Sequence, residues 1–146
     1  GTISWRKKQT DFIKAVRRIE MASEYYKPCK ELEQCEALDQ YWEKKQFDKF
    51  FEEYLKIAEE TSYPLAQCQV GFCYLEGIGV ERNFEKAFYW CLLAAEQGDW
   101  DAQYNLASMY EEGLYVEKDL EKAKHWYLCA ANQGHKLAMK KIVDKL

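Results

Sequence analysis

Two consecutive stretches of this chain are copies of one another at a spacing of 36 residues. Residues 66–99 align without a gap on residues 102–135, and 16 of the 34 aligned positions hold the same amino acid. Unrelated residues match roughly once in seventeen positions, so chance explains about two of these identities. A repeat of this length is typical of proteins built from stacked units, each of which buries its apolar face against its neighbours.

Each copy is predicted to be a pair of antiparallel helices. Apolar residues recur at helical spacing, and no stretch alternates as a half-buried strand does. Asn83 and Asp119 are the expected N-caps of the second helices, because their side chains can accept hydrogen bonds from free amides. Glycines are expected to end helices in the left-handed conformation, and tryptophans to fill the space between units. These structural positions are Gly77, Gly79, Trp90, Gly98, Gly113, Trp126 and Gly134.

The repeated residues resemble the Sel1-like repeat, a relative of the tetratricopeptide repeat. Its pattern is Ala-x-x-x-Leu-Gly-x-x-Tyr-x-x-Gly-x-Gly-Val followed by Asp-x-x-Lys-Ala-x-x-Trp-x-x-x-Ala-Ala-x-Gln-Gly, and residues 66–98 and 102–134 carry nearly all of it. The resemblance implies an all-α superhelix, a right-handed solenoid of antiparallel helix pairs. Tyr115 departs from the pattern at the second loop glycine. Since a non-glycine residue avoids positive φ, the second loop is predicted to differ in shape from the first.

The resemblance extends weakly beyond the two copies in both directions. We therefore divide the chain, as one domain, into five parts. They are an N-terminal capping helix at 1–28, a degenerate repeat at 29–63, repeats at 64–99 and 100–135, and a C-terminal capping helix at 136–146.

Composition excludes several function classes. A formal net charge of −4 argues against nucleic acid as a partner, since phosphate binding needs clustered Lys and Arg. No apolar run reaches the roughly 18 residues of a membrane span. No glycine-rich phosphate cradle or metal-ligand spacing occurs, so we expect no cofactor, no metal and no small-molecule ligand. His125 and His135 have no sequence partner that suggests catalysis and are expected to face solvent, so the protein is not predicted to be an enzyme.

The six cysteines are expected to be free thiols, which favours a reducing, cytoplasmic location. An alternative is the cysteine-rich secreted branch of the Sel1-like family, which is associated with β-lactam binding or hydrolysis. In that branch a cysteine pair recurs with each repeat, whereas no cysteine recurs at the 36-residue period here. A third alternative is a regulatory module of a larger protein.

By analogy with tetratricopeptide repeats, the first helices of the units line a concave groove. Aromatic side chains in a groove are common anchors for a peptide or helix, and carboxylates at its edge favour an apolar or basic segment. The function implied is therefore that of an adaptor scaffold that binds other proteins. An equally open alternative is that the N-terminal helix fills the groove and that the aromatic side chains of the groove belong to the core. The predicted groove residues are Trp42, Cys68, Phe72, Leu75, Glu76, Tyr104, Ser108, Glu111 and Glu112.

Overall fold

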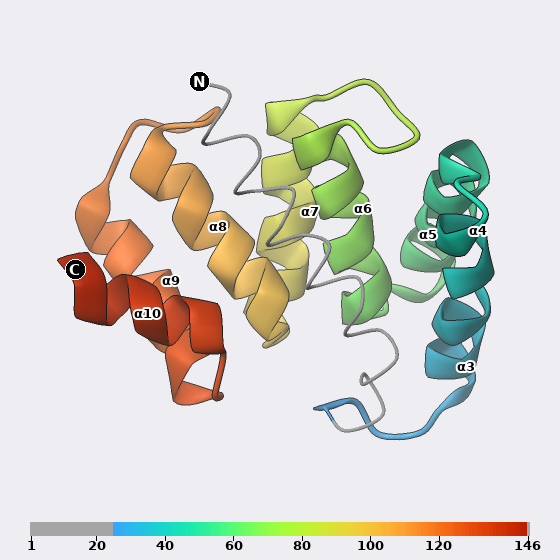
Figure 1. The fold of residues 1–146 in the computed structure, drawn as a ribbon, viewed down its shortest axis with the longest axis horizontal. Coiled ribbons are helices and arrows are strands. Elements are labelled where there is room, and N and C mark those ends of the chain that lie inside the picture. The colour runs from blue at the N-terminus through green and yellow to red at the C-terminus, as the bar shows by residue number, and fades with distance from the viewer. Residues whose placement is uncertain (1–24, 146) are drawn as a thin grey trace.

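The computed structural model describes residues 25–145, which form helices joined by short turns, with no strand in that part of the chain (Figure 1). The predicted capping helix at 1–28 lies outside the described residues except for its last four. The helices are α3 (Lys30–Ala37), α4 (Asp39–Glu43), α5 (Phe47–Thr61), α6 (Pro64–Glu76), α7 (Phe84–Glu96), α8 (Trp100–Glu112), α9 (Leu120–Asn132) and α10 (Lys136–Lys145). None of these helices has both the length and the apolar character needed to traverse a bilayer.

The two repeats are antiparallel helix pairs, α6 with α7 and α8 with α9, which follow one another across the molecule (Figure 1). Gly71 lets α6 approach α7 closely, because a Cβ atom at this position would lie 2.8 Å from Sγ of Cys91. Ala107, which is fully buried, holds the same place on α8. Small residues on the second helices, Ala87 and Ala123, are also fully buried. The predicted all-helical architecture of sequential pairs is therefore confirmed.

The predicted helix ends are confirmed at both repeats. Oδ1 of Asn83 accepts a hydrogen bond from the Lys86 amide at 3.0 Å, which caps α7. Oδ1 of Asp119 accepts from the Lys122 amide at the same distance, which caps α9. The first helices end in left-handed glycines, with φ of 72° at Gly77 and 70° at Gly113. Gly98 and Gly134, which follow the second helices, also have positive φ.

The prediction that the second loop differs in shape from the first is wrong. Tyr115 adopts a φ of 66°, almost the same as the 69° of Gly79 at the equivalent position. Matching backbone hydrogen bonds hold both loops, since the Asn83 amide donates to the Tyr74 carbonyl and the Asp119 amide to the Tyr110 carbonyl, each at 2.9 Å. The loop conformation is therefore set by these bonds at its ends. The tyrosine side chain fits because it is 58% exposed.

The two repeat tryptophans lie in similar, partly buried surroundings. Trp90 on α7 packs against a core cluster that also includes Phe51 and Tyr54 of the preceding helix α5. Trp126 on α9 packs against a cluster that includes Cys68 of the preceding pair. Each tryptophan thus contributes to a core that crosses from one helix pair to the one before it. This shared core is what makes the pairs a continuous stack.

Hydrogen bonds between glutamine side chains join the two helices of each repeat. Nε2 of Gln97, just after α7, donates to Oε1 of Gln67 on α6 at 2.6 Å. Thirty-six residues later, Nε2 of Gln133 donates to Oε1 of Gln103 at 2.8 Å. All four residues are identities of the repeat, and their bonds hold the end of each second helix beside the start of the first.

Candidate partner-binding face

The first helices of the repeats, α6 and α8, each have a face that points away from the helix following in sequence. On α6, Gln67 and Gly71 point toward α7, as shown by the bond to Gln97 and the contact with Cys91. Side chains on one face of a helix recur at i, i+4, i+7 and i+11. We call the side opposite α7 and α9 the inner face. Its residues are Leu65, Gln69, Phe72, Glu76, Asp101, Asn105, Ser108 and Glu112.

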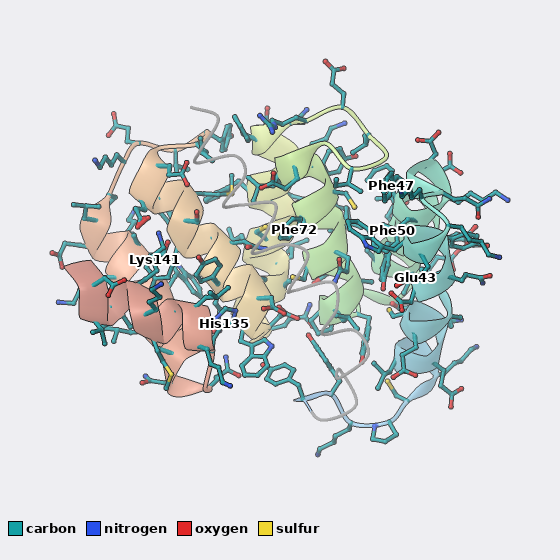
Figure 2. All side chains as sticks on the ribbon, in the orientation of Figure 1. Glu43, Phe47, Phe50, Phe72, His135 and Lys141 are labelled. Atoms are coloured by element: carbon teal, nitrogen blue, oxygen red, sulfur yellow. The ribbon has the colours of Figure 1, made fainter. Side chains whose placement is uncertain are left out.

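The apolar part of the inner face lies on α6 and is closed to solvent. Phe72 is 4% exposed and Leu65 is 6% exposed. Figure 2 shows Phe72 on α6, facing the middle of the molecule. Both side chains belong to the core cluster that extends from Leu32 on α3 to Met109 on α8. The inner face is therefore continuous with the core at its α6 edge.

Three of the residues on the inner face carry carboxylates. Glu76 lies at the end of α6, and Glu112 at the same position of α8, where it accepts a hydrogen bond from Oγ of Ser108 at 3.3 Å. Asp101, at the start of α8, pairs with Nε2 of His135 at 2.8 Å. None of the eight positions named for the inner face holds Lys or Arg.

Two amide side chains occupy equivalent inner-face positions, 36 residues apart. Gln69 on α6 is 4% exposed and Asn105 on α8 is 6% exposed. Within the described part of the chain, neither Oε1 of Gln69 nor Nδ2 of Asn105 has a hydrogen-bond partner. A buried polar atom without a partner is uncommon in folded proteins and calls for a specific explanation.

The structure distributes the nine predicted groove residues over three environments. Phe72, Glu76, Ser108 and Glu112 lie on the inner face. Trp42 and Leu75 belong to the core, and the Trp42 ring contacts Phe50 at 5.4 Å between centroids. The remaining three residues lie between successive helix pairs. They are Cys68, Tyr104 and Glu111.

The contacts of these last residues show how α8 joins α10. The Tyr104 ring stacks on His135, with centroids 5.0 Å apart and an interplanar angle of 10°. Oε1 of Glu111 accepts a hydrogen bond from Nζ of Lys141 at 3.0 Å. Figure 2 shows His135 and Lys141 beside α8. The expectation that His135 faces solvent is wrong: it is 4% exposed, because Asp101 and Tyr104 hold its ring.

A buried carboxyl group closes one end of the inner face. Asp99, the N-cap of α8, is 2% exposed, and its Oδ1 accepts a hydrogen bond from the Ala102 amide at 2.8 Å. Its Oδ2 accepts a hydrogen bond from the Tyr26 hydroxyl. Burial, together with the nearby carboxylate of Asp101, raises the pKa of Asp99 to about 6. Next to it, the Tyr25 ring stacks on Trp100 with centroids 4.6 Å apart.

The chemistry available at the described cysteines is limited. No disulfide joins the six cysteines, all of which lie in the described part of the chain. Burial raises the pKa of Cys35 and Cys91 to about 12, so both are protonated thiols near neutral pH. The nucleophile and the metal ligand is the thiolate, so these two groups are suited to packing. The described residues also contain no cluster of three side chains able to hold a metal ion.

Sequence reasoning did not find Gln69 and Asn105. Two features of the sequence point to them: each lies four residues after another inner-face position, and both equivalent positions hold an amide. The two positions hold different amino acids, Gln and Asn, so this pair is not among the identities of the repeat.

Comparison with known proteins identifies the repeats. Residues 64–99 and 100–135 each match the Sel1 repeat family. A solved structure of a Sel1 repeat protein from Oxalobacter formigenes is similar, with 37% identity and a TM-score of 0.61, over 63% of this chain and 26% of that chain. A protective antigen present in uropathogenic Escherichia coli strains, which displays an SLR fold, is also similar. It has 34% identity and a TM-score of 0.61, over 65% of this chain and 20% of that chain.

The chain therefore spans between a fifth and about a quarter of the length of these two proteins. No curated protein matches the sequence.

Proposed function

We propose that this chain, which is a Sel1-like repeat protein, acts as a protein-binding adaptor whose inner face holds a basic segment of a partner. The observation that carries the proposal is the composition of that face. Apolar Leu65 and Phe72 share this face with the carboxylates of Glu76, Asp101 and Glu112, on helices that successive repeats place side by side.

The charged residues and the apolar residues of the inner face have different roles in binding. Complementary charge increases the rate of encounter with a basic segment and excludes acidic ones. Apolar side chains that lose their remaining contact with water contribute most of the affinity. Leu65 and Phe72 are only 6% and 4% exposed, so their direct contribution to affinity is small.

The same geometry supports binding rather than catalysis. The imidazole of His135 is held between the Asp101 carboxylate and the Tyr104 ring. Buried thiols such as Cys91 are protonated near neutral pH. Unpaired thiols also favour a reducing compartment such as the cytoplasm as the place where the protein acts.

A random dodecapeptide library, selected on the immobilised full chain, tests the proposal. We expect the selected peptides to be enriched in Lys and Arg and to bind more weakly as salt is added. Glu112→Gln should weaken binding about two- to fivefold, the size expected for an exposed ion pair. Glu96→Gln on α7 is the matched control, since it removes an exposed carboxylate from the opposite side of the repeat.

Two results would contradict the proposed function. One is selected peptides without an excess of basic residues. The other is equal binding by the wild-type chain and Glu112→Gln at low salt.

A further inference from the structure

We propose that His125 and Cys129 bind a divalent cation of the Zn²⁺ class, and that a second copy of this chain completes the site with the same two residues. This inference goes beyond the proposed function, because both residues lie on α9, away from the inner face. It starts from one contact at the surface of that helix, where Sγ of Cys129 lies 3.8 Å from Nε2 of His125.

The two side chains point the same way because they are four residues apart on one helix. Residues at i and i+4 of an α-helix lie one turn apart on the same face. His125 is exposed and Cys129 is partly exposed, so a cation in solution can reach both. Imidazole nitrogen and thiolate sulfur are ligands that Zn²⁺ prefers in proteins. The pair therefore offers two suitable ligand atoms at an accessible surface.

The distance between the two ligand atoms fits one tetrahedral metal ion. With a Zn–S distance of about 2.3 Å, a Zn–N distance of about 2.0–2.1 Å and a tetrahedral angle, the two ligand atoms lie about 3.6 Å apart. The observed separation of 3.8 Å is close to this value, so small side-chain rotations bring both atoms onto one ion. Cys129 releases its thiol proton as it binds, since the thiolate is the ligand.

Other histidine and cysteine side chains of the protein are less suited to this role. His135 is buried, and its Nε2 is already paired with the Asp101 carboxylate at 2.8 Å. Cys29 is partly exposed. Its sulfur, however, contacts the Leu32 amide at 3.4 Å and the Tyr63 hydroxyl at 3.6 Å rather than an imidazole.

A second copy supplies the ligands that one chain lacks. Structural zinc sites have four protein ligands, whereas the described residues contain no group of three that could hold an ion. A two-fold axis through the ion brings the same two residues from a second copy, which gives a Cys₂His₂ set. Leu128, next to Cys129, is 38% exposed and gives the two copies an apolar contact beside the ion. Metal coordination, rather than a large buried area, then holds the dimer together.

Sedimentation of the full chain with and without Zn²⁺ tests the proposal. A phosphine reductant in all samples excludes disulfides between copies. We expect a monomer in the presence of the chelator EDTA, and a doubling of the mass with Zn²⁺, with one ion bound for two chains. Co²⁺ in place of Zn²⁺ should give the visible absorption of a tetrahedral ion and the ultraviolet absorption of a thiolate–metal bond.

Substitutions assign the effect to the two ligands. Cys129→Ser and His125→Gln should each abolish the dimer at Zn²⁺ concentrations that saturate the wild-type chain. Cys29→Ser is the matched control, because it removes a partly exposed thiol that has no histidine beside it, and it should form the dimer as the wild-type chain does. Circular dichroism should show the same helical content in all three variants, since none of the three side chains is fully buried.

Several results would overturn the inference. A wild-type chain that stays monomeric with Zn²⁺, with or without a bound ion, would show that the pair does not join two copies. A dimer that persists in EDTA would show that the metal is not its cause. A Zn²⁺-dependent dimer that survives Cys129→Ser, or that is lost in Cys29→Ser, would place the metal at other residues.

Discussion

The side-chain amide of Gln97 donates a hydrogen bond of 2.6 Å to Oε1 of Gln67, and so joins the end of α7 to the start of α6. The same amide nitrogen lies 3.1 Å from the Ser62 carbonyl, at the end of the preceding helix pair. Gln133 repeats both contacts, to Gln103 at 2.8 Å and to the Gly98 carbonyl at 3.0 Å. One side chain per repeat therefore connects three segments.

Loss of this amide should destabilise the stack. Gln97→Leu leaves the buried Oε1 of Gln67 without its donor, so the free energy of unfolding should fall by about 1–2 kcal/mol. Urea denaturation followed by circular dichroism measures the change. Gln34→Leu on the exposed side of α3 is the control and should change stability by less than about 0.5 kcal/mol. Equal stability of the two variants would show that this hydrogen bond does not stabilise the fold.

In the loop between α6 and α7, alanine should be tolerated at Gly77 but not at Gly79. Gly77 and Gly79 have similar φ, 72° and 69°, so alanine has a similar backbone cost, about 1–2 kcal/mol, at either position. A Cβ atom at Gly77 has no neighbour closer than 3.7 Å, whereas one at Gly79 would lie 2.1 Å from the Phe47 carbonyl oxygen. Gly79→Ala should therefore be less stable than Gly77→Ala by a further 1–3 kcal/mol or so in thermal unfolding. Matching unfolding temperatures would contradict the close approach of this loop to α5.

Asp99 should make the stability of the protein depend on pH. Its pKa is about 6 in the folded chain against 3.8 ordinarily, so the folded state binds the proton more tightly. This contribution to stability is fully present below about pH 4 and is lost as pH rises through about 6. Two pKa units correspond to roughly 3 kcal/mol. Urea unfolding between pH 4 and 7 should show this fall in the wild-type chain relative to Asp99→Asn. If the stability of both proteins changed with pH in the same way, the pKa of Asp99 would not be raised.

Removal of the Tyr26 hydroxyl should raise the pKa of Asp99 further. This hydroxyl donates to Oδ2 of Asp99, and a hydrogen bond to a carboxylate favours its charged form. In Tyr26→Phe the carboxyl should titrate above about 6, which the ¹³C chemical shift of its carboxyl carbon reports directly. A titration midpoint that stays unchanged or moves down would show that the hydroxyl does not stabilise the carboxylate.

The repeats and their helix ends could be predicted from the sequence because the residues that determine them are local. Asn83 caps α7 by bonding three residues ahead, and Gly77 ends α6 through its own backbone conformation. The shape of the second loop could not be predicted from Tyr115 alone. There, backbone bonds such as that from the Asp119 amide to the Tyr110 carbonyl outweigh the preference of a non-glycine residue for negative φ.

Less of the candidate site could be predicted from the sequence, because the environment of its residues depends on contacts between residues that are far apart in the chain. His135 is buried by Asp101 and Tyr104, which precede it by more than thirty residues. Amphipathic spacing indicates which face of α6 holds Phe72, but it does not show how deeply that side chain is buried. The amide of Gln69 stands out only in the structure, where its buried oxygen has no hydrogen-bond donor among the described residues.

Nuclear magnetic resonance of the full chain with a selected dodecapeptide tests most directly whether the inner face binds a partner. Side-chain amide signals report individual Asn and Gln residues. On binding, the NH₂ signals of Gln69 and Asn105 should move strongly, while that of Asn132 on α9 stays in place. Shifts confined to α7 and α9, with the Gln69 and Asn105 signals unmoved, would contradict the account.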